Sequence, residues 1–197
     1  MRPVLFGSHI DSVPNGGWLD GALGVMGALE TLRSLAEYGT PPCTVTLVDW
    51  ADEEGARFGR SLLGSSAVAG TLDPDAVRDL RDADGVRLED ALAAHGVELD
   101  CAPAAAKRLR DVRAYLELHI EQGPVLESLG LPVGTVLGTV GVERNRLIFR
   151  GQAAHAGSTP MTHRRDSLLA AARFALAVRD AAVRHGGMST TGGAVSR

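Results

Sequence analysis

Two apolar runs that end in polar residues, with a helical pattern between them, constrain the fold more than any other feature of this sequence. The runs PVLFGSH (residues 3–9) and CTVTLVDWADEEG (residues 43–55) have the composition of buried strands. Between them, apolar residues recur every three positions before Gly39: Leu23, Met26, Leu29 and Leu32. This pattern predicts an amphipathic helix that ends at a glycine. A strand, a helix and a second strand form a βαβ unit, so we expect a parallel α/β sheet.

A third strand is predicted by RAYLELHIEQGP (residues 113–124), in which polar and apolar residues alternate until Gln122-Gly123-Pro124. Residues 59–111 have weaker patterns, with short helices expected at DPDAVRDLRD and RLEDALAAHG, and we interpret this segment as scaffold. From residue 133, two strands with a turn precede QAAHAGSTPM and a long helix. We therefore expect two domains: a catalytic, metal-binding domain over residues 1–140 and the beginning of an α+β domain over residues 141–197.

Composition and charge exclude several classes of protein. Apolar residues make up 45% of the chain and charged residues 22%, which is typical of a soluble globular protein. We expect no membrane partner, since no apolar run approaches the ~20 residues of a membrane span, and a cytoplasmic location, since the first residues lack the pattern of a signal peptide. The net charge of −4 and the few aromatic residues argue against a nucleic-acid partner.

The candidate chemistry lies in histidines and acids at the predicted strand ends. In parallel sheets, ligands collect at the carboxyl ends of the strands. Four residues there offer the usual ligand atoms of zinc and related ions: His9, Asp20, Glu54 and His119. Asp11 lies two positions after His9, where its carboxylate could orient the imidazole. The alternative for each residue is a capping or hydrogen-bonded polar role.

The adjacent acids Glu53 and Glu54 strengthen the interpretation as a metal site. Neighbouring carboxylates at the end of a buried strand repel each other unless a positive charge neutralises them. A metal ligand beside a general base resolves this conflict. The sequence therefore predicts a catalytic metal centre at this edge of the sheet.

Four motifs in order and spacing carry a family resemblance: GSHIDSVPNGGWLDG, DEEGARFG, HIEQGPVLE and GQAAHAGSTPM. Together they resemble the N-carbamoyl-L-amino-acid hydrolase and allantoate amidohydrolase branch of the dinuclear zinc peptidase-like amidohydrolases. The resemblance covers essentially the whole chain. It implies an α/β/α sandwich catalytic domain, here partial, followed by the start of a lid and dimerisation domain.

The resemblance also implies roles for individual residues. His9 matches a ligand of one metal, Asp20 a carboxylate that bridges two metals, and Glu54 a ligand of the second metal. His119 fills a ligand position that is an acid in many related peptidases, which points to the carbamoyl and ureido branch. Glu53 matches the general base, and Asp11 matches the acid that orients the imidazole of His9.

Two further positions carry implied roles in substrate handling. His155 resembles a lid histidine that reaches the active site of the partner subunit and stabilises the reacting carbonyl oxygen, although a histidine in a turn before a helix is the alternative. Gln122 is the candidate substrate-binding residue. The implied cofactors are two divalent metal ions, zinc first, with manganese, cobalt or nickel as alternatives. The implied partners are a small carbamoyl or ureido substrate and a second copy of the chain.

The implied reaction is hydrolysis of a linear, non-peptide C–N bond by metal-activated water. The chain begins almost at the first catalytic strand and ends early in the lid, so we expect an internal piece of a longer enzyme without the family's last metal-binding histidine. Three hypotheses follow: a carbamoyl or ureido amidohydrolase, a peptidase or aminoacylase of the same superfamily, and a remnant that binds metal without turnover.

Overall fold

The computed structural model describes residues 2–139, 141, 143–189 and 191–192. Contacts within the chain divide it into two units, Met1–Gly134 and Thr135–Arg197. From the sequence we predicted a domain boundary at residue 140. The catalytic role of the first domain and the lid role of the second remain predictions. In the described part of the chain, no helix is both long enough and apolar enough to cross a membrane.

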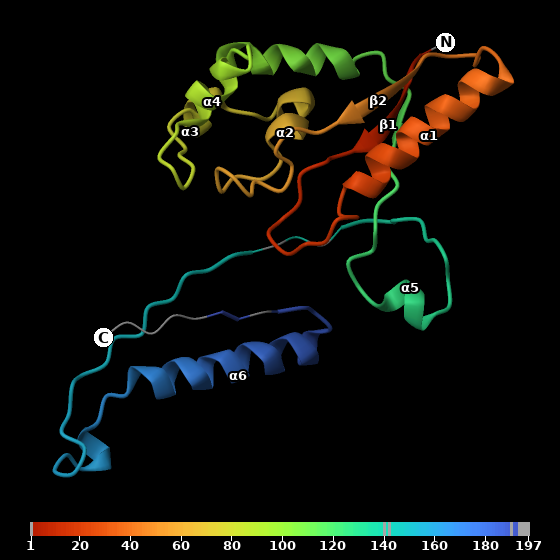
Figure 1. Ribbon diagram of the computed structural model, residues 1–197. Helices are drawn as coiled ribbons and strands as arrows, with labels where there is room; N and C mark the ends of the chain where they lie inside the picture. Colours follow the sequence, from red (N-terminus) through yellow and green to blue (C-terminus); the bar gives the residue numbers. More distant parts are fainter. Residues whose placement is uncertain (1, 140, 142, 190, 193–197) are drawn as a thin grey trace. The chain divides into compact units, whose positions relative to one another are not determined.

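The first unit contains a three-stranded parallel sheet, which confirms the predicted α/β class. Its strands are β1 (Val4–Ser8), β2 (Val45–Asp49) and β3 (Ala114–Leu116), in the order β2-β1-β3 (Figure 1). The register places Ser8 opposite Asp49. All three strands therefore end at one edge, and the polar segments that follow them begin there.

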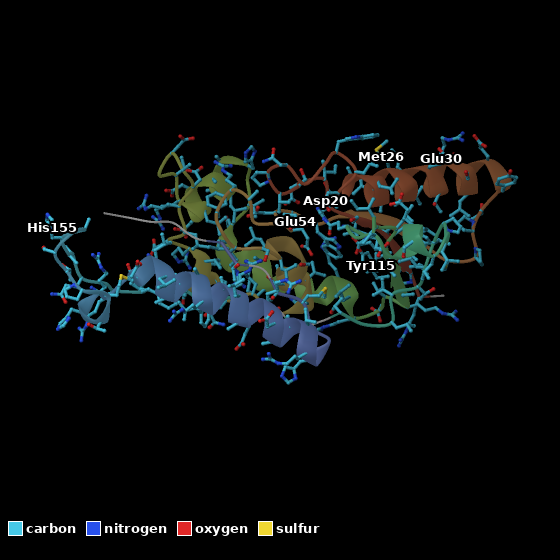
Figure 2. All side chains as sticks on the ribbon, turned by 90° about the horizontal axis from the view of Figure 1, so that it is seen from below. Asp20, Met26, Glu30, Glu54, Tyr115 and His155 are labelled. Carbon is cyan, nitrogen blue, oxygen red and sulfur yellow. The ribbon has the colours of Figure 1, made fainter. Side chains whose placement is uncertain are left out.

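Helix α1 (Ala22–Tyr38) connects β1 to β2 and packs against both strands (Figure 1). The helix was predicted, but the stripe of Leu23, Met26, Leu29 and Leu32 does not form its buried side. Met26 is 60% exposed, and Figure 2 shows it with Glu30 on the outer side of α1. Residues spaced by three turn about 300° at about 100° per residue, so the stripe drifts around the helix. The buried residues of α1 are Gly24, Val25 and Ala28.

The segment after β2 folds into a small helical cluster with its own core. It comprises α2 (Leu63–Ala69), α3 (Pro74–Val77), α4 (Leu88–Ala94) and the 3₁₀ segment η1 (Leu99–Leu109). The predicted short helices correspond to α3 and α4, whereas α2 and η1 were not foreseen. The core is apolar and consists of Phe58, Leu63, Ala67, Leu72, Val77, Leu88 and Leu99. After β3, the short helix α5 (Val125–Ser128) ends this unit.

The described part of the second unit contains a 3₁₀ turn, η2 (Met161–His163), and the predicted long helix, α6 (Ser167–His185). Asp166 caps α6 by accepting a hydrogen bond from the Leu169 amide at 3.0 Å. The two strands expected between residues 133 and 151 are absent from the described part of that segment. Leu137 is 98% exposed. A two-stranded hairpin is marginal on its own. Phe149 of this segment instead lies beside Phe174 of α6, with the ring centroids 5.8 Å apart.

Candidate metal centre

His9 lies buried directly after β1, and the backbone fixes its tautomer. Its Nδ1 atom lies 2.6 Å from the carbonyl oxygen of Asp11. A carbonyl oxygen only accepts hydrogen bonds, so Nδ1 carries the hydrogen and Nε2 keeps a lone pair. The Asp11 carboxylate is farther away, at 3.6 Å from Nδ1. The main chain of Asp11, rather than its carboxylate, therefore makes the hydrogen bond that orients His9.

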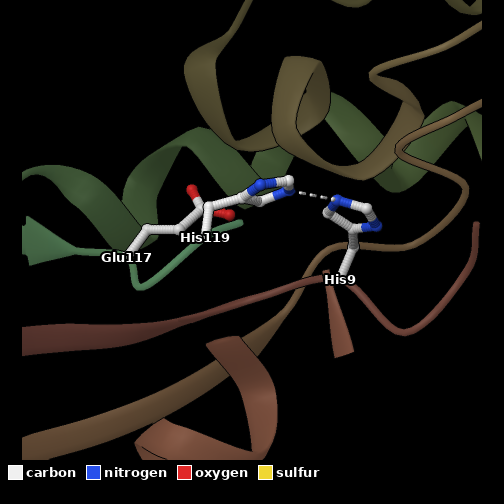
Figure 3. A group of neighbouring side chains, drawn as sticks. All are labelled: His9, Glu117 and His119. Atoms are coloured by element: carbon white, nitrogen blue, oxygen red, sulfur yellow. Dashed lines mark hydrogen bonds between the residues drawn. The ribbon is translucent and has the colours of Figure 1, made fainter. Parts of the chain in front are cut away.

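His119, after β3, is fixed in the same way. Its Nδ1 atom lies 2.8 Å from the carbonyl oxygen of Ile120, which leaves a lone pair on Nε2. The Nε2 atoms of His9 and His119 face each other at 3.4 Å (Figure 3). The carboxylate of Asp20 lies 3.5 Å from Nε2 of His119. When both rings are neutral and carry their hydrogens on Nδ1, three electron-rich atoms converge without a hydrogen to share, and a positive charge between them would stabilise this arrangement.

Asp20 provides a second indication that this site suits a cation. Its side chain is fully buried, and among the described residues its Oδ2 atom has no hydrogen-bond partner. The other oxygen accepts a hydrogen bond from Nε2 of Gln122 at 3.0 Å. Burying an unpaired carboxylate oxygen is costly, and a bound cation removes this cost. The donor set therefore fits a divalent metal ion.

Two groups of side chains bring ligand atoms within 4.8 Å of one another, and His9 belongs to both. The first group is His9, Asp20 and Glu54, and Figure 2 labels its two acids. The second is His9, Glu117 and His119, drawn in Figure 3. The chain thus brings all four predicted ligands together.

Glu117 is a site residue that the sequence analysis did not single out. Its Oε1 atom accepts a hydrogen bond from Ser8 Oγ at 2.5 Å, and its Oε2 atom accepts one from the Tyr115 hydroxyl at 2.8 Å. Trp50 Nε1 in turn donates to the Tyr115 oxygen at 2.9 Å. The available signal was spacing, because residues two apart on an extended chain point to the same side, as Glu117 and His119 do.

The Asp11 carboxylate holds the loop that carries the two glutamates. Its oxygens accept hydrogen bonds from the Glu53 amide at 3.2 Å and the Glu54 amide at 2.9 Å. The loop also folds back on itself, since the Leu62 amide donates to the Glu53 carbonyl at 2.8 Å. Asp52 has a φ of 50°, a left-handed conformation that is unusual for a residue other than glycine. The sharp turn after β2 thus places both carboxylates at the sheet edge.

Glu53 lies in a different environment from its neighbour. Burial raises the pKa of the Glu53 carboxyl group, as do the nearby charges of Glu117 and Asp11. The Ser65 hydroxyl donates to Glu53 Oε2 at 2.7 Å and, together with His9, acts against this rise in pKa. A raised pKa beside candidate ligands is typical of an acid or base in catalysis.

His155 lies in the second unit and is exposed there. Its Nδ1 atom accepts hydrogen bonds from the amides of Gly157 and Ser158, both at 3.2 Å. Arg164 donates to the carbonyl oxygens of His155 and Ala156. His155 is therefore part of an ordered turn and not of either group of candidate ligands.

Known proteins resemble this chain over nearly its whole length. An N-carbamoyl-L-amino acid amidohydrolase of Geobacillus stearothermophilus is 46% identical over 195 residues, which cover 98% of this chain and 47% of that protein. An allantoate amidohydrolase of Escherichia coli strain K12 is 45% identical over 172 residues, covering 87% of this chain and 41% of that protein. The crystal structure of a hydantoinase/carbamoylase family amidase from Burkholderia ambifaria superposes with a TM-score of 0.67 at 35% identity, over 94% of this chain and 45% of that chain.

The chain thus spans about half the length of the curated relatives that it matches. These relatives confirm the resemblance that the four motifs predicted. Residues 5–195 also match the sequence model of one family. On this evidence the chain belongs to peptidase family M20/M25/M40.

Proposed function

We propose that this chain carries the metal centre of an amidohydrolase that cuts a linear, non-peptide C–N bond in carbamoyl or ureido compounds. The observation that carries the proposal is the pair of Nε2 lone pairs on His9 and His119, which face each other at 3.4 Å beside the carboxylate of Asp20. The relatives named N-carbamoyl-L-amino acid amidohydrolase and allantoate amidohydrolase support this substrate class.

Four residues would hold two divalent cations: His9, Asp20, Glu54 and His119. Imidazole and carboxylate ligands favour zinc, with manganese, cobalt or nickel as alternatives. A divalent cation in such a site supplies Lewis acidity, which polarises a carbonyl group and makes water a stronger acid. Glu117 lies within reach of the two histidines and is itself fixed by Ser8 and Tyr115.

Glu53 would act as the general base. Its Oε2 atom accepts a hydrogen bond from Ser65, which leaves Oε1 to take a proton from the attacking water and pass it to the leaving nitrogen. The Asp11 carboxylate anchors the amide of Glu53 and so fixes the position of this base. Gln122 would bind the substrate with its amide group, which in the structure donates to Asp20.

His155 would stabilise the developing negative charge on the substrate oxygen by donating a hydrogen bond from Nε2. We propose that it acts in the active site of a second copy of the chain, so the functional protein is a homodimer. The fixed Nδ1 contacts with Gly157 and Ser158 suit this role, because they leave Nε2 as the donor.

Ammonia release tests the substrate class directly. The purified chain is loaded with zinc, manganese, cobalt or nickel in turn and incubated with N-carbamoyl-L-amino acids and allantoate. N-acetyl amino acids and dipeptides are the matched alternatives, and release of the free amino acid is measured for these. Glu53→Gln is the control variant, since glutamine keeps the shape of the side chain and cannot accept a proton.

Each outcome distinguishes one hypothesis. Turnover of carbamoyl or ureido substrates that Glu53→Gln abolishes supports the proposal. Faster turnover of acyl or peptidyl substrates replaces it with a peptidase or aminoacylase. Tight metal binding without turnover of any of these substrates contradicts the proposed activity of this chain and supports a metal-binding remnant.

A further inference from the structure

The turn at residues 155–159 fixes which nitrogen of His155 can donate. The amides of Gly157 and Ser158 both point at Nδ1, each at 3.2 Å. A backbone amide only donates, so Nδ1 must be the acceptor and the neutral imidazole carries its hydrogen on Nε2. The exposed nitrogen of His155 is therefore a hydrogen-bond donor before any substrate arrives.

Arg164 also holds this turn together. Its Nη2 atom donates to the carbonyl oxygens of His155 at 3.2 Å and Ala156 at 2.7 Å. The Thr159 amide also donates to the His155 carbonyl, at 3.3 Å. Two carbonyl groups that converge on one point repel each other unless a cation lies between them, and Arg164 supplies that positive charge.

The burial of Arg164 shows that this contact is built into the fold. Arg164 is partly buried, whereas its neighbour Arg165 is exposed. Its Nε atom is buried and has no hydrogen-bond partner among the described residues. Burying an unpaired N–H is unfavourable, so the contacts of Nη2 and the packing of the side chain must outweigh this cost.

We propose that Arg164 is a positioning residue for His155, which holds the turn so that His155 presents its Nε2 hydrogen to a developing oxyanion. This inference rests on the proposed function, in which His155 is the donor. Without Arg164, the two carbonyls separate, the turn opens, and the amides of Gly157 and Ser158 leave Nδ1. The tautomer with the hydrogen on Nδ1 then becomes accessible, and in that form Nε2 has nothing to donate.

Nuclear magnetic resonance of the uniformly ¹⁵N-labelled chain tests the proposal without any need for activity. Long-range ¹H–¹⁵N correlation at alkaline pH reports the tautomer of the neutral His155 ring. Arg164→Met keeps the apolar stem and removes the donors, whereas Arg164→Lys keeps a positively charged donor. Arg165→Ala is the matched control, because it removes the adjacent exposed arginine.

We expect the Nε2–H tautomer to dominate in the unchanged chain, in Arg164→Lys and in Arg165→Ala. In Arg164→Met the share of the Nε2–H tautomer should fall to the share found in a short peptide that contains the same histidine. Hydrogen exchange of the Gly157 and Ser158 amides should also be about five- to tenfold faster, the effect of losing one ordinary hydrogen bond. If Arg164→Met loses α6 by circular dichroism, Arg164→Gln gives the same comparison, with a side chain too short to reach both carbonyls.

An unchanged tautomer ratio and unchanged exchange in a folded Arg164→Met or Arg164→Gln variant would overturn the proposal. A tautomer change in Arg165→Ala equal to that in Arg164→Met would also overturn it, since the effect would then be general loss of charge. Failure of the proposed function is a separate result, because it shows as absent ammonia release and leaves the ring tautomer as it is.

Discussion

Replacing Gly24 by alanine should destabilise the first unit and weaken its metal site together. Gly24 lies on the buried side of α1. A Cβ atom added there would lie 2.4 Å from the carbonyl oxygen of Leu118 and 2.5 Å from Cβ of Ser8. Leu118 precedes His119 and Ser8 precedes His9, so whichever backbone moves to relieve the contact also moves a candidate ligand.

The expected size follows from two opposing effects. Carbon atoms in contact stay about 3.5–4.0 Å apart, so the packing must open by about 1 Å, and overpacking of this kind costs about 1–3 kcal/mol. Because the obstacle is backbone, we take the upper end of this range. Alanine in place of glycine stabilises a helix by about 1 kcal/mol. The net loss in the free energy of unfolding is therefore about 2 kcal/mol.

Gly27→Ala is the matched control on the same helix. Its added Cβ atom would lie 3.2 Å from Cδ2 of Leu118, the end of a flexible side chain, so the gain in helix propensity should dominate. Urea unfolding of the metal-free chain should separate the two variants by roughly 3 kcal/mol, or about a hundredfold in the equilibrium constant. Competition with a chromophoric chelator should show zinc affinity lower by about tenfold in Gly24→Ala alone.

Two results would contradict this prediction, each in a different part. If Gly24→Ala is as stable as Gly27→Ala and binds zinc with the affinity of the unchanged chain, α1 does not approach the two strand ends as closely as the structure has it. If it is destabilised with zinc affinity unchanged, the packing argument survives and the link to the metal site is wrong.

Three further predictions concern the roles of the site residues. Glu53→Gln should lower kcat by roughly 10²–10⁴-fold with metal content nearly intact, while Glu54→Gln should lose one metal; equal metal loss by elemental analysis in both would show that this assignment of roles is wrong. His9→Ala should lose one ion and keep the other, because the single lone pair on Nε2 can bind only one metal, and His119→Ala should likewise keep one ion, as zinc titration would show. Mixing His155→Ala with Glu53→Gln chains should restore activity in mixed dimers, and inactive mixed dimers would place His155 outside the partner's site.

The sheet and the positions of the site residues along it were predictable from local pattern. Apolar runs that end in His9 and in Glu53-Glu54 indicate buried strands, and parallel strands bring their carboxyl ends to one edge. Strand β3 is shorter than predicted, yet His119 still lies at that edge because Gln122-Gly123-Pro124 breaks the extended segment soon after it. Proximity of the ligands thus followed from topology alone.

The contacts that decide the chemistry depend on packing that no single segment encodes. The buried side of α1 uses Gly24 and Ala28 because small residues let the helix approach β1 closely, and an apolar stripe does not reveal this. Glu117 is held in the site partly by Ser8, which lies 109 positions away in the sequence. Such pairings arise from strand register, which the pattern of a single segment does not determine.

Asp11 shows most clearly what spacing can and cannot establish. Its place two residues after His9 predicted that the two would meet, and they do, but the oxygen that binds the imidazole is the carbonyl. This leaves both carboxylate oxygens free for the amides of Glu53 and Glu54. One residue therefore sets the tautomer of a candidate ligand through its main chain and positions the candidate base through its side chain. Asp11 therefore links His9 to the loop that carries Glu53 and Glu54. A substitution of the Asp11 side chain should disturb that loop and leave the hydrogen bond of His9 in place, because the main chain of Asp11 makes it.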